Sequence, residues 1–337
     1  MWSDVILTRR KIVKMPQSVE KNATEIGKEF WLALASIGGI GPIQIRYLLR
    51  EFETLEAAFS ADLTEIARLP MFDSLLAAKL QKARIGLSDL RRHIDWYESQ
   101  GIQIITWQEA TYPEQLKQIS NAPVALACRG DFKSVQKPTV AIVGTRTPTS
   151  EGVAVTLELT NLLVQSGYTI ASGLDKGVDL TAHTTALACD GLTCAVLPTD
   201  LLSVYPPENE SLSLQIQTRG ALFSEHIFPT PLSAANLLAR HRVTTGLSIA
   251  TIVVESSADD EVLRAASFAR EQGRFVCSID WGSRTDYLAE GCSQLIKSGA
   301  ISVPFNGLAE FVESFTSSAT TSEFQATYVQ GEQMGLF

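Results

Sequence analysis

Glycine and basic residues recur together in short loops that follow apolar runs of the chain. The first loop is Gly144-Thr145-Arg146, directly after VAIV, and the second runs from Ser172-Gly173 to Lys176-Gly177, directly after YTIA. Glycine lets a backbone approach a ligand closely, and a basic side chain beside free helix amides neutralises an anion. Both loops therefore predict contact with phosphate, although an ordinary turn between strand and helix explains the first loop about equally well.

Two further stretches add positive charge. Arg240-His241-Arg242 stands in front of an apolar run, and Gly291 to Ala300 is a predicted helix that opens with glycine and closes with Lys297. The first stretch is expected to direct its arginines at the edge of a sheet. The alternative is a solvated helix end, where arginine offsets the helix dipole.

Residues for catalysis or metal binding are not arranged in any recognisable pattern. Asp179 and His183 stand one helical turn apart, but no third ligand accompanies them, which favours a capping and packing pair over a metal site. A nucleophile with a positioned base is missing. The Gly144 loop is not G-x-G-x-x-G and has no acidic ribose partner, so no cofactor is expected. We therefore predict a binding protein and no enzyme.

The elements that must position these loops alternate between strand and helix after Pro138. Buried strands are predicted at VAIVG, YTIASG, LTCAVLP, ALFSEH, ATIVVES and RFVCSI, each followed by an amphipathic stretch. This alternation predicts an α/β fold with a doubly wound, Rossmann-like, mostly parallel sheet. Ligands of such sheets bind at the carboxyl ends of the strands, where Arg146, Lys176, Arg240, Arg242 and Lys297 would form one basic rim.

The rest of the chain divides around this sheet. Residues 1–25 are an N-terminal arm, 26–98 are helical with a Gly38-Gly39-Ile40-Gly41-Pro42 turn, 99–314 hold the sheet, and 315–337 are a flexible, Ser/Thr-rich tail. Within the third range GIQIITW is a predicted strand. The stretch TYPEQLKQISNAPVALACRG is predicted to be a connecting segment, because it is rich in turn residues.

Composition limits the partners and the compartment. The net charge is −9, which disfavours general nucleic-acid affinity, so any such site must be a local basic patch on an acidic body. No apolar run is long enough to span a membrane, and the N-terminal residues lack the apolar region that is typical of a signal peptide. The five cysteines lack CxxC spacing and most lie in apolar runs, which indicates free thiols in a reducing cytoplasm.

These loops, in this order, resemble the DNA-processing protein DprA (Smf) family. The motifs that carry the resemblance are VGTR from Val143, SGLDKGVD from Ser172, Ala182-His183, YPPEN from Tyr205, Ser224-Glu225, Arg240-His241-Arg242, Gly246-Leu247-Ser248, VVE from Val253, Gly273-Arg274, and Gly291 to Ala300. The resemblance extends upstream to Thr111-Tyr112-Pro113-Glu114-Gln115-Leu116 and to FWLALASIGGIGPIQIRYLLREF, and covers about residues 29 to 303.

The resemblance implies a homodimer that binds single-stranded DNA without catalysis, shelters incoming strands in natural transformation and loads the recombinase RecA. It places Arg146, Lys176, Arg240 and Arg242 at DNA-facing positions, and it makes the N-terminal helices a SAM-like domain whose GIGP turn is similar to a helix-hairpin-helix. The chain departs from the family pattern at Lys176, His241, Ser293 and the acidic run Asp259-Asp260-Glu261. No winged helix is expected after the sheet.

The last five residues form a separate motif. Gln333-Met334-Gly335-Leu336-Phe337 resembles the bacterial sliding-clamp-binding pentapeptide, in which a glutamine anchors by hydrogen bonds and two bulky apolar side chains fill a pocket. We expect Gln333, Met334, Leu336 and Phe337 to make those contacts. The alternative is that the tail folds back on its own sheet or on a dimer mate.

Three hypotheses of function follow. The first is a single-strand binder and recombination mediator, tethered to the clamp. The second is a nucleotide-ligand-binding sensor or enzyme on the same Rossmann-like fold, and the third is an adaptor that acts through its tail alone. Salt-sensitive affinity for oligo-dT, lost on charge reversal at Arg146 and Lys176, distinguishes the first from the others.

Overall fold

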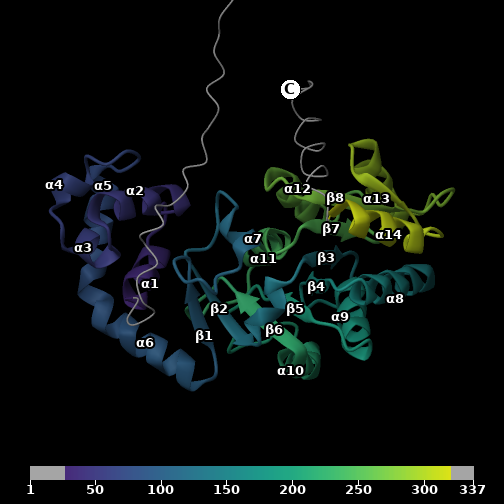
Figure 1. The fold of residues 1–337 in the computed structure, drawn as a ribbon, viewed down its shortest axis with the longest axis horizontal. Helices are drawn as coiled ribbons and strands as arrows, with labels where there is room; N and C mark the ends of the chain where they lie inside the picture. The colour runs from purple at the N-terminus through teal and green to yellow at the C-terminus, as the bar shows by residue number, and fades with distance from the viewer. Residues whose placement is uncertain (1–26, 320–337) are drawn as a thin grey trace, which may run out of the picture.

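The computed structural model describes residues 27–319 and contains one nine-stranded sheet in the order β1-β2-β6-β5-β4-β3-β7-β8-β9 (Figure 1). The strands are β1 (Gln103–Thr106), β2 (Ala125–Gly130), β3 (Thr139–Val143), β4 (Thr169–Ser172), β5 (Thr193–Val196), β6 (Gly220–Ser224), β7 (Ala250–Val253), β8 (Phe275–Asp280) and β9 (Ile301–Pro304). Seven neighbouring strands of the sheet, in the order β6-β5-β4-β3-β7-β8-β9, are parallel, whereas β2 pairs antiparallel with both β1 and β6. The predicted doubly wound, mostly parallel sheet is confirmed.

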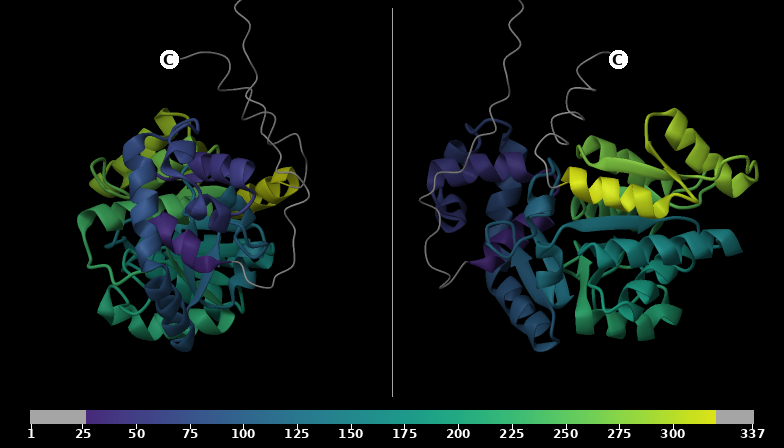
Figure 2. Two further views of the ribbon diagram at one scale, coloured as in Figure 1. Left: turned by 90° about the vertical axis from the view of Figure 1, so that its left-hand side faces the viewer. Right: turned by 45° about the vertical axis from the view of Figure 1, so that its right-hand side comes forward.

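Helices cover both faces of this sheet. They are α7 (Glu114–Lys117), α8 (Ser150–Gln165), α9 (Val178–Ala188), α10 (Glu210–Arg219), α11 (Ala234–Gly246), α12 (Leu263–Glu271), α13 (Tyr287–Lys297) and α14 (Leu308–Ala319). Because right-handed crossovers run in opposite directions from β3 and from β7, α8, α9 and α10 lie on one face and α12 and α13 on the other. The last helix, α14, returns to pack along α8 (Figure 2).

The strand order reverses between β3 and β7. From β3 the chain proceeds outward through β4, β5 and β6, and from β7 it proceeds the other way through β8 and β9. All residues of β3 are buried, and Val143 pairs with Val253 at the carboxyl ends of the two strands. The loops that leave β3 and β7 therefore separate at this point, which is where α/β sheets bind ligands.

The N-terminal helices pack against the antiparallel end of the sheet (Figure 1). They are α1 (Lys28–Ser36), α2 (Pro42–Phe52), α3 (Leu55–Ser60), α4 (Leu63–Ile66), α5 (Ser74–Ala83), the 3-10 turn η2 (Arg84–Gly86) and α6 (Leu87–Ser99). Trp31 of α1, Leu126 of β2 and Val243 of α11 belong to one buried cluster. The helical region thus shares its core with the sheet.

The sequence prediction differs from the structure at three elements. ALACRG, predicted as part of a connecting segment, forms β2, and ISVP forms the unpredicted edge strand β9. The last helix continues to Ala319, beyond the predicted start of the tail at 315, because Phe315 is buried against the rings of Tyr168 and Phe275. Residues 1–26 and 320–337, with the arm and the clamp-like motif, lie outside the described residues.

No helix among residues 27–319 is both long and apolar enough to cross a membrane. Four of the five cysteines are buried and all five are free, as the sequence predicted.

Candidate nucleic-acid interface

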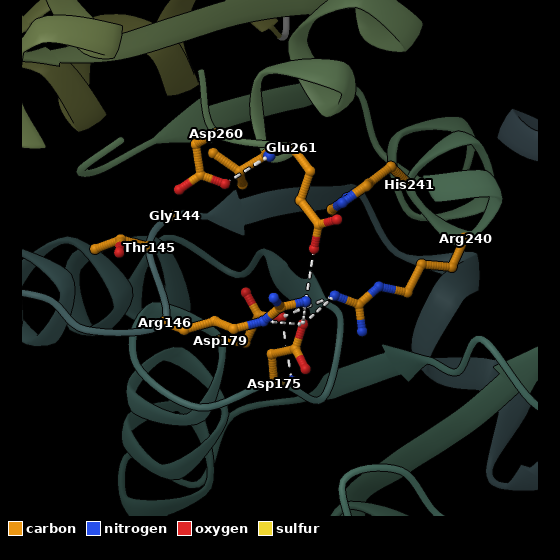
Figure 3. Close-up of a pocket in the computed structure, with 10 residues that line it drawn as sticks. Gly144, Thr145, Arg146, Asp175, Asp179, Arg240, His241, Asp260 and Glu261 are labelled. Carbon is orange, nitrogen blue, oxygen red and sulfur yellow. Dashed lines mark hydrogen bonds and ion pairs between the residues drawn. The ribbon is translucent and has the colours of Figure 1, made fainter. Parts of the chain in front are cut away.

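A pocket of about 220 Å³ opens where the loops after β3 and β7 separate (Figure 3). It is lined by Gly144, Thr145, Arg146, Asp175, Asp179, Arg240, His241, Asp260, Glu261 and Val262. The loops after β3, β4 and β7 contribute to the lining, as does the middle of α11. The structure therefore brings two of the predicted basic residues, Arg146 and Arg240, together at the switch point of the sheet.

Arg240 is the buried cation of this pocket, with 4% of its surface exposed. Its guanidinium lies 2.5 Å from the Oδ2 atom of Asp175 and 3.9 Å from that of Asp179. A Cβ on Gly173 would lie 2.8 Å from the guanidinium carbon, so glycine is required for this close approach. Arg240 sits within α11, buried and paired, and is not the solvated helix end that the sequence left open.

Two nitrogens of Arg240, Nε and one terminal NH group, and the Nε2 atom of His241 are buried without a hydrogen-bond partner. A buried polar group without a partner costs about 1–3 kcal/mol, and more when it is charged, so such groups are rare in folded proteins. All three atoms belong to residues that line the same pocket. The two arginine nitrogens lack an acceptor within the described residues, and a phosphate oxygen is an acceptor that matches their charge.

The two buried carboxyl groups respond differently to their surroundings. Burial opposes ionisation of Asp175, but Arg240 and Arg146 outweigh it and lower the pKa of this carboxyl. Burial raises the pKa of Asp179 to about 6, and repulsion from Asp175 adds to the rise, which Arg240 and hydrogen bonds from Ser172 and the Asp175 amide only partly offset. Asp175 is therefore the fixed counter-ion of both arginines, whereas Asp179 titrates near neutral pH.

Both buried histidines near the pocket are neutral. Burial and the charge of Arg240 lower the pKa of His241 to about 3. Burial lowers the pKa of His183 to about 4, and its ring nitrogens bond the Thr193 hydroxyl at 2.7 Å and the Gly173 carbonyl at 2.6 Å. His183 is thus a packing residue, as expected from the sequence, whereas Asp179 lines the pocket and accepts from the Asp175 amide at 3.3 Å.

Arg146 is the exposed cation of the pocket. Its Nε and one terminal nitrogen donate to Asp175 at 3.2 and 3.1 Å, while half of its side chain remains exposed. The loop after β4 packs closely against the backbone of Thr145 and Arg146. A Cβ on Gly177 would lie 2.4 Å from the Thr145 carbonyl oxygen, and Gly177 adopts φ +77°, so glycine is needed there. Asp175 therefore fixes the orientation of Arg146 toward the pocket mouth.

The amides at the N-terminus of α8 are already occupied. The carboxylate of Glu255, which is 0% exposed, accepts hydrogen bonds from the Thr149 amide at 2.8 Å and the Thr149 hydroxyl at 2.7 Å, and it pairs with Arg284 at 2.8 Å. A Cβ on Gly152 would lie 2.2 Å from this carboxylate. The Thr149 and Gly152 amides are therefore not free for an anion, and the Glu255 carboxylate lies at the helix end where Rossmann folds bind a nucleotide phosphate.

The remaining predicted basic residues do not line the pocket. Lys176, on the loop after β4, is exposed and pairs with the equally exposed Glu208 at 3.1 Å. Arg242 is largely buried and engages Glu225 and the Asn121 carbonyl. Lys297 ends α13, which places it at the amino edge of the sheet, opposite the pocket.

The predicted small residues hold the backbone of the site in place. The Ser172 hydroxyl is buried and donates to the Ile142 carbonyl at 2.6 Å. A Cβ on Gly144 would lie 2.7 Å from the Val178 side chain. Gly291 lies inside α13, which begins at Tyr287, and packs against backbone oxygens of Ser256 and Ser257.

Four carboxylates of the site were not assigned these contacts from the sequence: Asp175 and Asp179 beside Arg240, Glu255 at α8, and Glu261, which was expected only as part of an acidic run near the rim. The sequence offers one indication for Asp175 and Asp179, because the loop Ser172–Asp179 contains both carboxylates together with small residues. No local pattern announces Glu255 or Glu261, because their partners Thr149 and Arg146 lie more than a hundred residues away in the chain.

Comparisons with known proteins agree with this architecture. The family model of DNA recombination-mediator protein A matches residues 103–315. Protein Smf of Synechocystis sp. is 34% identical over 275 residues, covering 80% of this chain and 69% of that protein. DNA processing protein DprA of Bacillus subtilis is 35% identical over 212 residues, covering 63% of this chain and 71% of that protein.

Two solved structures are similar in fold. DprA of Streptococcus pneumoniae superposes with a TM-score of 0.68 at 28% identity, covering 82% of this chain and 94% of that one. DprA of Helicobacter pylori, described for its single-stranded DNA binding mode, has a TM-score of 0.57 at 25% identity, covering 64% and 95%. The chain belongs to the DprA/Smf family of DNA recombination-mediator proteins.

Proposed function

We propose that this recombination mediator binds single-stranded DNA by its phosphate backbone at the pocket between β3 and β7. The observation that carries the proposal is the pair of arginines there: Arg240 is buried with two unpartnered nitrogens, and Arg146 is half exposed beside it. Both guanidinium groups are oriented by Asp175. The Helicobacter pylori relative, which is described as binding single-stranded DNA, supports the choice of ligand.

Phosphate is the chemical group that this arrangement fits. A phosphate oxygen accepts charge-assisted hydrogen bonds from guanidinium groups, and such contacts carry no sequence information. With a net charge of −9, the protein repels nucleic acid over most of its surface, so binding depends on these few groups. We expect sequence-independent, strongly salt-dependent affinity for a flexible single strand, whose phosphates can enter a pocket of this size.

Binding rather than chemistry is also the better fit for the nearby side chains. His183 and His241 are buried with pKa values of about 4 and 3, so neither is poised as a general base near neutral pH. Cys194 and Cys277 lie in β5 and β8 and do not line the pocket, and burial raises the pKa of each to about 12, which keeps these thiols protonated. The pocket thus holds oriented cations without an activated nucleophile.

The test measures anisotropy of labelled oligo-dT and of duplex DNA from low to moderate salt. Arg146→Glu should lower oligo-dT affinity more than tenfold, because it reverses the exposed charge of the pocket. Arg219→Glu is the matched control: Arg219 is similarly exposed and paired with Asp190 at 2.7 Å, but it ends α10 at the opposite edge of the sheet. Equal losses in both variants, or no salt-dependent binding by the wild type, would refute the proposal.

The wider role follows the family and the tail motif. We propose that the protein acts as a homodimer, delivers the bound strand to RecA in natural transformation, and is tethered to the sliding clamp by Gln333-Met334-Gly335-Leu336-Phe337. Deleting residues 333–337 should abolish binding to purified clamp in calorimetry and leave oligo-dT affinity unchanged. Retained clamp binding after the deletion would exclude the tether, and unchanged RecA filament assembly on covered single strands would exclude delivery.

A further inference from the structure

An acidic loop lies across the mouth of the pocket. It follows β7, contains Asp259, Asp260 and Glu261, and leads into α12. The Glu261 carboxylate reaches down to Arg146, and its Oε1 atom lies 2.6 Å from a terminal nitrogen of that guanidinium (Figure 3). Arg146 is therefore held by two carboxylates, Asp175 from within the fold and Glu261 from the mouth.

The two carboxylates differ in how firmly they are held. The Asp175 side chain is 8% exposed and also contacts Arg240. Its movement away from Arg146 would therefore also remove a counter-ion of the buried Arg240. The Glu261 side chain is 35% exposed, and its carboxylate is paired with Arg146 alone among the described residues. An exposed ion pair of this kind contributes about 0.2–1 kcal/mol, so water or another anion replaces Glu261 at small cost.

The backbone of the acidic loop does not depend on that contact. The Asp260 carboxylate accepts from the Val262 amide at 3.0 Å, and the Asp260 carbonyl accepts from the Leu263 amide at 3.2 Å. The Glu261 carbonyl accepts from the Arg264 amide at 2.9 Å. The turn therefore stays in place while the side chain of Glu261 rotates away from Arg146.

We propose that Glu261 is a built-in competitor for the phosphate site: its carboxylate occupies the solvent-facing side of Arg146 and must be displaced when a DNA phosphate binds. This inference rests on the proposed DNA-binding function. Displacement of Glu261 does not alter the contacts of Arg240 and His241, because Glu261 does not contact their unpartnered nitrogens. Glu261 thus lowers the affinity for isolated phosphates, and a strand that presents several phosphates to the rim displaces it more effectively.

The test compares two substitutions that remove the same charge from the same loop. Glu261→Gln should tighten oligo-dT binding roughly threefold to fivefold at low salt, with an unchanged melting temperature, since the pair is exposed. Asp259→Asn is the control, because Asp259 is exposed and bonds Ser257 at 2.9 Å without lining the pocket. It should change the affinity less than about 1.5-fold, because solvent screens a charge that touches no ligand.

A double-mutant cycle assigns the effect to Arg146. In an Arg146→Gln background the further change Glu261→Gln should have no effect, because the competed cation is gone. An equal gain from Asp259→Asn, a gain that persists without Arg146, or no gain at all would overturn the inference while leaving the DNA-binding function intact. Absence of oligo-dT binding by the wild type and by every variant would overturn both.

Discussion

Two places at the same edge of the sheet bring carboxylates and arginines together, with opposite results. At the N-terminus of α8, Glu255 is fully buried and its charge is matched by Arg284 and by the Thr149 amide and hydroxyl. In the neighbouring pocket, Arg240 is equally buried but keeps two nitrogens without a partner. We call the first place the closed joint and the second, which is the proposed phosphate site, the open site.

The difference shows why the fold alone does not identify the ligand. In a dinucleotide-binding protein the helix N-terminus after the first parallel strand receives the pyrophosphate. Here the chain supplies its own carboxylate at that position, and the unsatisfied donors lie one loop away, on α11. This displacement disfavours the nucleotide-sensor hypothesis and favours a ligand that spans the rim.

The largest expected effect is on the buried cation of the open site. Arg240→Met should lower the free energy of unfolding by about 3–5 kcal/mol, because it leaves Asp175 and Asp179 buried with less compensation. It should also abolish oligo-dT binding. Urea denaturation followed by circular dichroism measures the first effect, and Arg219→Met, which breaks an exposed pair, should cost less than about 1 kcal/mol. Similar losses from both variants would contradict the distinction.

The closed joint should affect stability alone. Glu255→Gln should lower the free energy of unfolding by about 2 kcal/mol, since it removes a buried charge that faces Arg284. Oligo-dT affinity should stay within about twofold of the wild type, because phosphate binding does not use this position. A large loss of affinity in a fully folded Glu255→Gln protein would place the phosphate site at α8 instead.

The raised pKa of Asp179 predicts how the open site depends on pH. The folded protein holds this carboxyl's proton up to about pH 6, whereas an unfolded chain releases it near 3.8. Its contribution to the free energy of unfolding therefore falls as pH rises from about 4 to 6. Protonation also removes a negative charge beside Arg240, so oligo-dT binding should tighten about twofold between pH 7.5 and 5.5.

Asp179→Asn should remove the contribution of Asp179 from both pH profiles: the tightening of oligo-dT binding toward pH 5.5 should disappear, and the free energy of unfolding should no longer contain the term that falls from about pH 4 to 6. Anisotropy and urea denaturation at matched ionic strength measure the two profiles. In the folded protein His183 and His241 do not titrate in this window, because burial lowers their pKa values to about 4 and 3. In the unfolded chain both titrate near 6.5, so their contribution to the free energy of unfolding rises with pH over the same window, and only the difference between the variant and the wild type reports Asp179. A profile that keeps its slope in Asp179→Asn would assign the titration to another group.

The smallest effects concern the outer lysines. Lys176→Ala should weaken oligo-dT binding a fewfold and reduce the salt slope by about 1, because Lys176 extends the rim of the open site. Lys297→Ala should change neither quantity, because Lys297 lies at the opposite edge of the sheet. Affinity and its salt dependence for the two variants are compared by anisotropy, and a larger loss from Lys297→Ala would place the DNA path on the other edge.

The sequence predicted the parallel sheet well because each of its central strands is a run of buried, β-branched or small apolar residues. Strands β2 and β9 were not predicted, for different reasons. ALACRG follows Pro123 and turn residues and contains few β-branched side chains, and ISVP is a partly exposed edge strand that ends in proline. Their places in the sheet depend on pairing with distant strands, which a local pattern does not encode.

The site was predicted in location more than in mechanism. The loop motif placed Arg146 at the carboxyl edge correctly, because glycine and arginine after a buried strand leave few other positions. Whether an arginine is free, paired or buried depends on side chains remote in sequence, as for Arg240 with Asp175 and for Arg242 with Glu225. The presence of basic residues in the sequence therefore overestimated how many of them lie at the rim of the pocket.

The core shared by the helical region and the sheet has a consequence for how the molecule unfolds. Trp31, Leu126 and Val243 come from three separate parts of the chain and lose their packing together when any one part detaches. The two regions are thus one cooperative folding unit, with a single melting transition expected for the described residues. Cutting the chain after Ser99 would expose the apolar surface of Trp107 and Leu126, so the sheet region alone is expected to aggregate rather than bind DNA.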